Sequence, residues 1–302
     1  MDNSEDKAGE LREKIKNTIC DLLRQFGYSR SAERETKTLP TYPVVVIGAY
    51  SSFNTILNKR VRALPVVITY DIVSGSIKIE CPIIRHGAPV SYYEACLELV
   101  RLSMENDFER MCGDGVRRFI EMKLKALENY YRDKNAIVLV SGDGFMRNEL
   151  WPGISNKRIE GYSFNENGTD KIDIGSSKLS MMFDFGRSKL RIVRMRFNDE
   201  VPDYYLDDGN STNAGKGYYM YDDVYYVSVP IEKKDLRYAL GGKNYSKDTP
   251  HADYCSKKLS EYFPLRLCGG DDCFKIVNYL NELRKCSIQY KGSTNRPLPL
   301  HY

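Results

Sequence analysis

The stretch Ala136–Asn156, AIVLVSGDGFMRNELWPGISN, constrains the fold of this chain more than any other. Its first five residues, Ala136–Val140, are apolar and predict a buried β-strand, which Gly142-Asp143-Gly144 ends abruptly. Arg147 and the only tryptophan, Trp151, follow within a few residues. Because open α/β folds bind their ligands at the carboxyl edge of the sheet, this pattern predicts a polar site at that edge. The alternative is a glycine-rich turn with the tryptophan anchoring a loop.

The residues before this stretch predict three strands and two helices. Apolar strands are expected at 44–48, 64–71 and 76–84, with a hairpin turn at 73–75 between the last two. Amphipathic helices are expected at 92–104, where Ser91 and Glu94 form a capping box, and at 115–132. Three antiparallel strands followed by a helical crossover to a fourth strand is the order of an RNase H-like core. We therefore predict an α/β, RNase H-like fold with a mixed central sheet flanked by helices.

The second half of the chain is again rich in strands. An alternating strand is expected at 190–197, a tyrosine-rich hairpin at 218–229 with its turn at 222–223, and a helix at 271–285. Polar loops are expected at 198–217 and 241–258. Composition does not shift between Val44 and Tyr302, so residues 43–302 are predicted to form one domain.

Residues 1–42 are predicted to be a helical arm and a linker. A helix is expected over 5–27, because Leu11, Ile15, Ile19, Leu22, Leu23 and Phe26 recur at helical spacing and Gly27 is a plausible end. Its apolar stripe is expected to dock against another surface, in this chain or in a preceding domain. The polar residues 28–41 are expected to be the linker.

Charge and cysteine usage limit the class of protein only broadly. The formal net charge of +4 permits a nucleic-acid partner without arguing for one. The N-terminus is acidic and polar, with no sign of a signal peptide, and no apolar run approaches the length of a membrane span. The eight cysteines are scattered and suggest no zinc site. We expect free thiols, a cytoplasmic protein and no membrane partner.

Two segments resemble a known family. The stretch AIVLVSGDGFMRNELWPGISN and the tail LRKCSIQYKGSTNRPLPLHY are similar to ordered motifs of the prokaryotic PIWI family named for its arginine and glutamate, pPIWI-RE. The strands with Arg194 and Arg196 and with Tyr225-Tyr226 stand where that family has similar strands. The resemblance extends from about Val44 to Tyr302.

The resemblance implies an RNase H-like PIWI domain that binds nucleic acid. An RNA–DNA hybrid or guide–target duplex is the expected ligand, in prokaryotic defence, with a helicase and a nuclease as possible partners. Family members are usually much longer than this chain. The family's arginine after the fourth strand corresponds to Arg147, and its glutamate in the first helix to Glu94, with Glu98 one turn further along as a rival.

The binding prediction rests on five residues. Arg147 can fork onto a phosphate with the help of Asn148, and Glu94 can orient Arg147 or a sugar hydroxyl. Arg194 and Arg196 are two residues apart on one strand face and predict a positive stripe that contacts the backbone of the ligand. Solvated or capping roles for the same residues are the alternatives.

Cleavage would require a set of carboxylates holding Mg²⁺ or Mn²⁺. Asp143 stands where the fourth strand of an RNase H fold carries one, and it is the candidate metal ligand. Tyr50 stands where the first-strand aspartate belongs, and the chain stops at Tyr302, before the helix expected to carry the last acid. Asp71 is the possible substitute, although it also suits a hairpin turn. An active nuclease that uses Asp143 and Asp71 therefore stays an alternative to binding, as does a protein-interaction scaffold with a decayed site.

Overall fold

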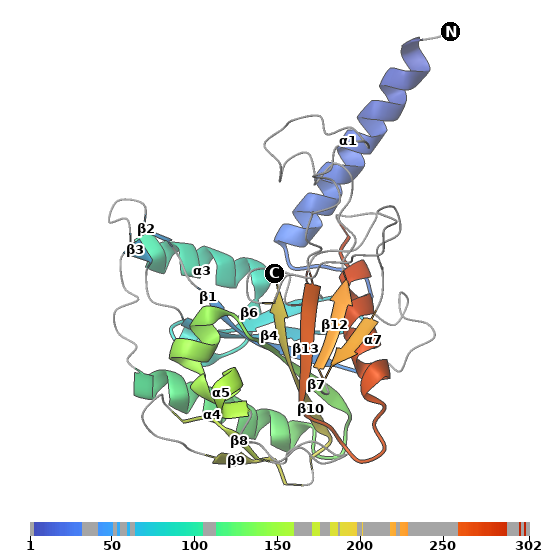
Figure 1. Cartoon of the computed structure of the whole chain (residues 1–302). Helices are drawn as coiled ribbons and strands as arrows, with labels where there is room; N and C mark the ends of the chain where they lie inside the picture. The colour runs from blue at the N-terminus through green and yellow to red at the C-terminus, as the bar shows by residue number, and fades with distance from the viewer. Residues whose placement is uncertain are drawn as a thin grey trace.

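The computed structural model describes residues 3–31, 42–50, 53–54, 59–60, 64–104, 113–159, 171–175, 182–186, 188–197, 201, 218–221, 224–228, 259–288, 296 and 299. Its centre is a mixed sheet with the strand order β11-β12-β13-β10-β7-β1-β4-β5-β6 (Figure 1). The strands are β1 Val44–Tyr50, β4 Leu64–Tyr70, β5 Ile77–Glu80, β6 Val90–Ser91, β7 Ala136–Ser141, β10 Leu190–Phe197, β11 Tyr218–Tyr221, β12 Val224–Ser228 and β13 Leu259–Arg266. Strands β1, β7 and β10 are parallel to one another, and the other pairings are antiparallel.

Helices cover both faces of this sheet. They are α3 Tyr92–Met104, α4 Gly113–Tyr130, α5 Asn156–Ile159 and α7 Cys273–Glu282, with short turns at Arg85–Gly87, Met146–Leu150, Pro152–Ile154 and Leu283–Lys285. Two small hairpins, β2 Phe53–Asn54 with β3 Lys59–Arg60 and β8 Lys171–Asp173 with β9 Met182–Asp184, complete the described elements. The predicted RNase H-like arrangement, three antiparallel strands and a helical crossover to a fourth strand parallel to the first, is confirmed.

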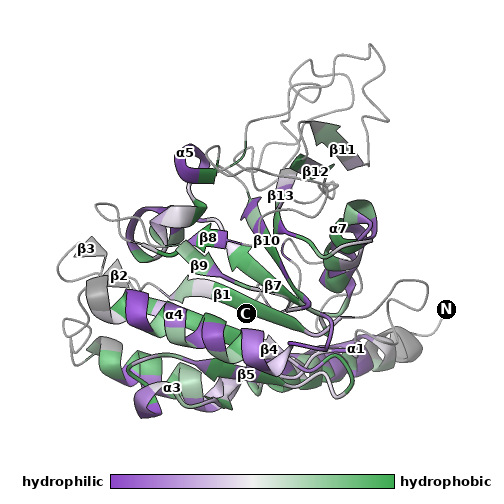
Figure 2. Cartoon of the chain, turned by 90° about the horizontal axis from the view of Figure 1, so that it is seen from below, coloured by the Kyte–Doolittle hydropathy of each residue, from purple (hydrophilic) through white to green (hydrophobic). Residues whose placement is uncertain are grey.

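The central strands are apolar throughout because both of their faces are buried. Val46 and Leu139 belong to the core under α3 and α7, whereas Val45 and Val138 belong to the core under α4. Figure 2 shows these strands as the most hydrophobic part of the chain, with α4 mixing polar and apolar residues around its circumference. Strand β1 is therefore fixed between two cores, and its carboxyl end is presented at one edge of the sheet.

The sequence analysis did not predict one of the central strands. Strand β13 pairs along β10, yet its sequence LSEYFPLR contains a proline and a glutamate that are unusual in a central strand. The pairing shifts register between Ile192 and Val193, next to Pro264. The strand predicted at 76–84 is shorter than expected, because β5 ends at Glu80 and a turn follows. Apart from Val201, the loops predicted at 198–217 and 241–258 lie outside the described residues.

The N-terminal arm is a long helix whose end is attached to the sheet. Helix α1, Asn3–Gln25, projects away from the body of the molecule and ends before Gly27, which has a positive φ of 82° (Figure 1). Part of the predicted linker is ordered: the Ser29 amide donates to the Gly75 carbonyl at 3.0 Å, and Ser31 Oγ to the Ile72 carbonyl at 2.9 Å. The division of the chain into 1–42 and 43–302 remains a prediction. Among the described residues, no helix has the length and apolar character needed to cross a membrane.

Candidate nucleic-acid interface

The candidate site lies at the carboxyl edge of the three parallel strands. Because β1, β7 and β10 run in the same direction, Tyr50, Asp143 and Arg196 come to the same edge of the sheet. The turns that follow β7 add Arg147 to this edge. The position predicted for a polar site from the strand and its glycine turn is therefore occupied by charged side chains from several segments.

Asp143 holds the turn that follows β7. Its Oδ2 accepts a hydrogen bond from Ser141 Oγ at 2.7 Å, and its Oδ1 accepts one from the Met146 amide at 3.0 Å. The second contact is an N-terminal cap for the helical turns that carry Arg147 and Asn148. Both carboxylate oxygens thus have a structural use, and the half-buried Asp143 side chain positions the segment that presents the arginine.

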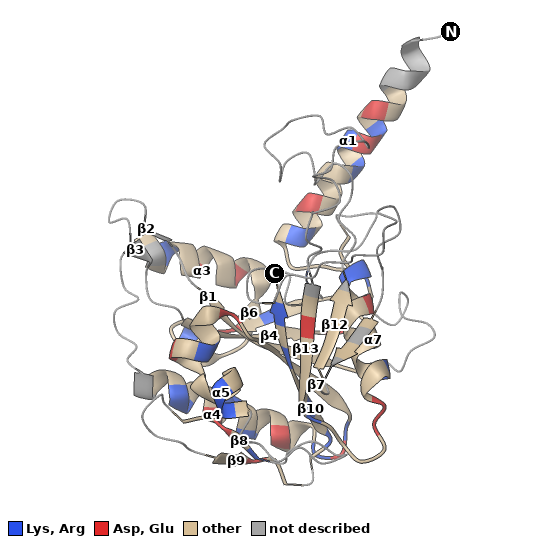
Figure 3. Ribbon diagram, viewed as in Figure 1, with Lys and Arg blue, Asp and Glu red and all other residues tan. Residues whose placement is uncertain are grey.

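Three arginines gather around Gly142 at this edge. Arg147 donates from Nη1 to the Gly142 carbonyl at 3.0 Å. A Cβ atom at Gly142 would lie 2.7 Å from Cγ of Arg196 and 3.1 Å from Cγ of Arg194, so glycine is required where the stems of these two arginines cross β7. Figure 3 shows the basic residues of β10 beside the glutamate of β13. We call Arg147, Arg194 and Arg196 the arginine cluster.

One buried glutamate is shared by two members of the cluster. Glu261 is 1% exposed; its Oε1 accepts from Arg194 Nη2 at 2.9 Å and from Arg196 Nε at 2.7 Å, and its Oε2 pairs with Arg196. Arg194 also donates from Nη1 to the Ile154 carbonyl at 2.7 Å and to Asn156 Oδ1 at 2.8 Å. Burial lowers the pKa of Arg194 to about 10, although Glu261 opposes that shift, so the group is still charged at neutral pH.

The members of the cluster differ in exposure. Arg194 is 2% exposed and is committed to internal contacts, the Arg196 side chain is 13% exposed, and Arg147 is half-buried. Asn148, next to Arg147, is exposed. Arg147 and Arg196 both add to the positive field on Arg194 and lower its pKa further, which places the three charges close to one another. Roles for these residues in nucleic-acid binding stay predictions.

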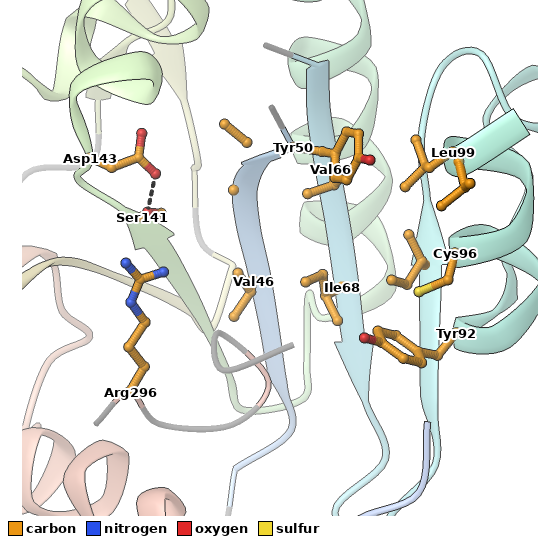
Figure 4. A pocket seen from close by; sticks show the side chains of 14 residues that line it. Val46, Tyr50, Val66, Ile68, Tyr92, Cys96, Leu99, Ser141, Asp143 and Arg296 are labelled. Carbon is orange, nitrogen blue, oxygen red and sulfur yellow. Dashed lines mark hydrogen bonds between the residues drawn. The ribbon is translucent and has the colours of Figure 1, made fainter. Parts of the chain in front are cut away.

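A groove opens beside Asp143, on the face of the sheet opposite Arg194 and Arg196. It has a volume of about 250 Å³ and lies between α3 and strands β1, β4 and β5. Val46, Val66 and Ile68 form its floor, Ser141, Asp143 and Arg296 line one end, and Tyr50 lies beside Val66 (Figure 4). Burial raises the pKa of the Tyr50 hydroxyl. The sequence analysis did not single out Arg296, because nothing local marks an arginine of the tail as a neighbour of β7.

Asp71 does not meet Asp143. Strand β4 runs antiparallel to β1, pairing Leu64 with Tyr50 and Tyr70 with Val44, so Asp71 lies at the opposite edge of the sheet. Six residues of strand separate the two edges by roughly 20 Å. Asp71 Oδ1 accepts from the Val73 and Ser74 amides at 2.8 and 3.1 Å and closes the hairpin turn. The structure thus assigns Asp71 the turn role and does not unite the two aspartates of the nuclease alternative.

Glu94 is also distant from the groove end that holds Asp143. Helix α3 starts where Ser91 pairs with Lys78, near the edge of the sheet that carries Asp71. Ser91 Oγ accepts from the Glu94 amide at 3.2 Å, which confirms the predicted serine cap, and the Glu94 carboxylate pairs with Arg85. The rival Glu98 pairs with Arg101 at 2.6 Å on the exposed side of the same helix. Neither glutamate lines the groove.

The donor set for a catalytic metal is incomplete in the described part of the chain. Within those residues, no group of three or more His, Cys, Asp or Glu side chains could hold an ion. Asp143 has no carboxylate beside it in the groove lining, and Tyr50 occupies the end of β1. The described residues at this edge therefore do not form a two-metal site.

Trp151 anchors a loop, as the alternative interpretation of the glycine-rich turn predicted. Trp151 is fully buried, and its Nε1 donates to the Asp173 carbonyl at 2.7 Å. A Cβ atom at Gly153 would overlap that same carbonyl, so the Trp-Pro-Gly segment packs directly on β8. This contact fixes the turns between Asp143 and Asn156, and through them the arginine cluster.

Comparison with protein-family models agrees with this architecture. A family model described as the RNase H domain of pPIWI_RE matches residues 57–302. Among solved structures, an A. aeolicus Argonaute is similar with a TM-score of 0.37 and 10% identity over 87% of this chain and 27% of its own length. A Marinitoga piezophila Argonaute in complex with a 5′-OH guide RNA has a TM-score of 0.32 and 13% identity over 85% and 28%. The chain thus spans about a quarter of each Argonaute, and no curated protein matches it.

Proposed function

Because this chain belongs to the pPIWI-RE family through its RNase H domain, we propose that it binds nucleic acid at the carboxyl edge of β7 and β10. The arginine cluster carries this proposal. Arg194 and Arg196 share the buried carboxylate of Glu261, and Arg147 binds the Gly142 carbonyl nearby, so the three guanidinium groups outnumber the carboxylates of Glu261 and Asp143 at this edge. A guanidinium presents paired N–H donors that match the oxygens of a phosphate.

The members of the cluster have different roles in the proposal. Arg147 and Arg196 are less buried than Arg194 and contact phosphates of the ligand, with the exposed Asn148 as an additional donor. Arg194 is buried and holds Glu261, which in turn orients Arg196. The proposal includes no direct contact between Glu94 and Arg147, because Glu94 pairs with Arg85 at the start of α3.

We propose an RNA–DNA hybrid or a guide–target duplex as the ligand, in prokaryotic defence. Family membership supports this choice, because a PIWI-type RNase H fold offers a sheet edge and groove to a duplex backbone. The proposal includes a cytoplasmic location, in keeping with the free cysteines of the described residues, and a helicase and a nuclease as partner proteins.

Fluorescence anisotropy with a labelled RNA–DNA hybrid tests the proposal. Arg147→Ala is expected to weaken binding by about tenfold and to reduce the slope of log K against log salt by about one, since one phosphate contact is lost. Arg132→Ala is the matched control, because Arg132 is exposed at the end of α4, near the opposite edge of the sheet. Equal affinity of the Arg147→Ala and wild-type proteins, at equal stability, would refute the proposed contact.

A further inference from the structure

The arginine cluster is continued across the sheet by a tyrosine. Strand β10 pairs with β13 through Arg196 and Glu261, and β13 pairs with β12 through Glu261 and Tyr226. Directly paired residues of antiparallel strands have their side chains on the same face of the sheet. Arg196, Glu261 and Tyr226 therefore form one row across three neighbouring strands, on the face where Glu261 binds Arg194 and Arg196.

The two faces of β12 have different surroundings. Val227 is 3% exposed in the core under α7, and Tyr225 packs against the same core. Because side chains alternate along a strand, Tyr226 lies on the other face. The core under α4 includes no described residue of β11 or β12, so it ends before it reaches Tyr226. Tyr226 is half-buried, which leaves part of this residue at the surface, one strand away from Glu261.

A tyrosine beside a cluster of arginines has the chemistry that holds an unpaired base. Proteins that bind single-stranded nucleic acid combine positive charge along the phosphate backbone with aromatic rings on which bases stack. Such stacking tolerates any sequence, because every base has a π-face. The arginine cluster supplies the charge, and Tyr226 supplies the ring on the same face of the sheet.

The spacing of the row suits a nucleic-acid strand. Neighbouring strands of a sheet are about 4.8 Å apart, so the backbones of Arg196 and Tyr226 are separated by roughly 10 Å. Phosphates of one duplex strand follow one another at about 3.4 Å along the axis, so a phosphate bound by Arg196 is about three nucleotides away from one over Tyr226. Inside a duplex both faces of a base are stacked on its neighbours. The ring of Tyr226 can therefore be reached only by a base beyond the paired region.

We propose that Tyr226 is a stacking platform for an unpaired nucleotide that extends beyond the hybrid held by the arginine cluster. This role rests on the proposed function and adds the class of ligand to it, because a hybrid with single-stranded extensions is bound in preference to a blunt one. The contribution of Tyr226 depends little on salt, since stacking releases no counterions, whereas the phosphate contacts of Arg147 and Arg196 weaken as salt is added.

Fluorescence anisotropy with two probes tests this role. One probe is a blunt RNA–DNA hybrid, and the other is the same hybrid with forked ends, in which a few nucleotides of both strands are unpaired. The wild type is expected to bind the forked hybrid at least about fivefold more tightly, as for one base stacked on an aromatic ring. Tyr226→Leu should lose this preference and keep the affinity for the blunt hybrid. Tyr226→Phe should keep both, because stacking requires the ring and not the hydroxyl.

Tyr225→Leu is the matched control, since it removes the neighbouring ring from the opposite face of β12 and should keep the preference for the forked hybrid. The blunt hybrid reports the folding of every variant, because binding to it depends on the arginine cluster. Equal affinity of the wild type for the two hybrids would overturn the role of Tyr226 alone, as would a Tyr226→Leu variant that keeps the preference or a Tyr226→Phe variant that loses it. A wild type that binds neither hybrid would overturn the proposed function as well.

Discussion

The two edges of the central sheet hold their buried charges in different ways. At the edge where β7 and β10 begin, Arg191 forms a two-pronged ion pair with Asp271, one guanidinium to one carboxylate. At the edge where these strands end, Glu261 serves both Arg194 and Arg196, and Arg147 lies nearby. Arg191 has a carboxylate to itself, and the nearby Arg266 donates to the Leu190 and Ser188 carbonyls, whereas two arginines of the cluster share one carboxylate and Arg147 adds a further charge.

Removing the carboxylate of Glu261 is expected to have the largest effect on the free energy of unfolding. Glu261→Gln leaves two guanidinium groups without their partner, one of them 2% exposed, so it should lower the free energy of unfolding by about 3–5 kcal/mol. Asp271→Asn removes the carboxylate partner of Arg191 alone, so it should lower the free energy of unfolding by less. Urea unfolding of both variants measures the difference, and equal losses would show that the two edges are equivalent.

Gly142→Ala should have the next largest effect. The added Cβ would lie 2.7 Å from Arg196 Cγ and 3.0 Å from the Met195 carbonyl, so the strand or the arginine must move. We expect a loss of about 1–3 kcal/mol in the free energy of unfolding, as for other overpacked sites. Gly48→Ala in β1 is the control, because its Cβ would have no neighbour nearer than 3.8 Å. Similar losses in both variants would disprove the steric role assigned to the arginine stems.

Asp143→Ala tests whether the aspartate beside the cluster is structural. Loss of its bond to the Met146 amide should cost about 1 kcal/mol of stability, the usual value for an N-cap. Hybrid binding should weaken modestly, since the turn that carries Arg147 loses its support. Thermal unfolding and anisotropy measured together check this expectation. A metal-dependent cleavage activity that disappears in this variant would contradict the structural role.

Much of the fold could be predicted from sequence because its signals are local. The strand at 44–48, the helix after Ser91 and the hairpin turn at Gly75 each follow from periodicity or turn chemistry within a few residues. Strand β13 could not be predicted, since its pairing with β10 depends on residues 60 or more positions away and its own sequence includes Pro264. For the same reason Glu261 and Arg296 were missed, although both lie beside predicted site residues.

The separation of the two aspartates teaches the same lesson. The sequence does not show at which edge of the sheet Asp71 lies, because a carboxylate at the end of a strand has the same sequence pattern at either edge. Only the antiparallel register of β4 on β1, with Tyr70 beside Val44, assigns it to the edge opposite Asp143. The glycine turn after β7 and the buried Trp151, in contrast, marked the correct edge because their signals belong to a single segment.

Among these substitutions, Asp71→Ala should have the smallest effect on the free energy of unfolding, and this effect should depend on pH. Hydrogen bonds from the Ser74 and Val73 amides lower the pKa of this carboxyl below its ordinary value of 3.8, so the ionised form stabilises the folded state. That contribution is fully present above the unfolded pKa and is lost as the pH falls through the folded pKa. The wild type should therefore exceed Asp71→Ala by about 0.5–1 kcal/mol at neutral pH, with a difference that shrinks below about pH 4. Chemical unfolding at pH 7 and pH 3 measures it, and a difference that grows on acidification would refute the turn role of Asp71.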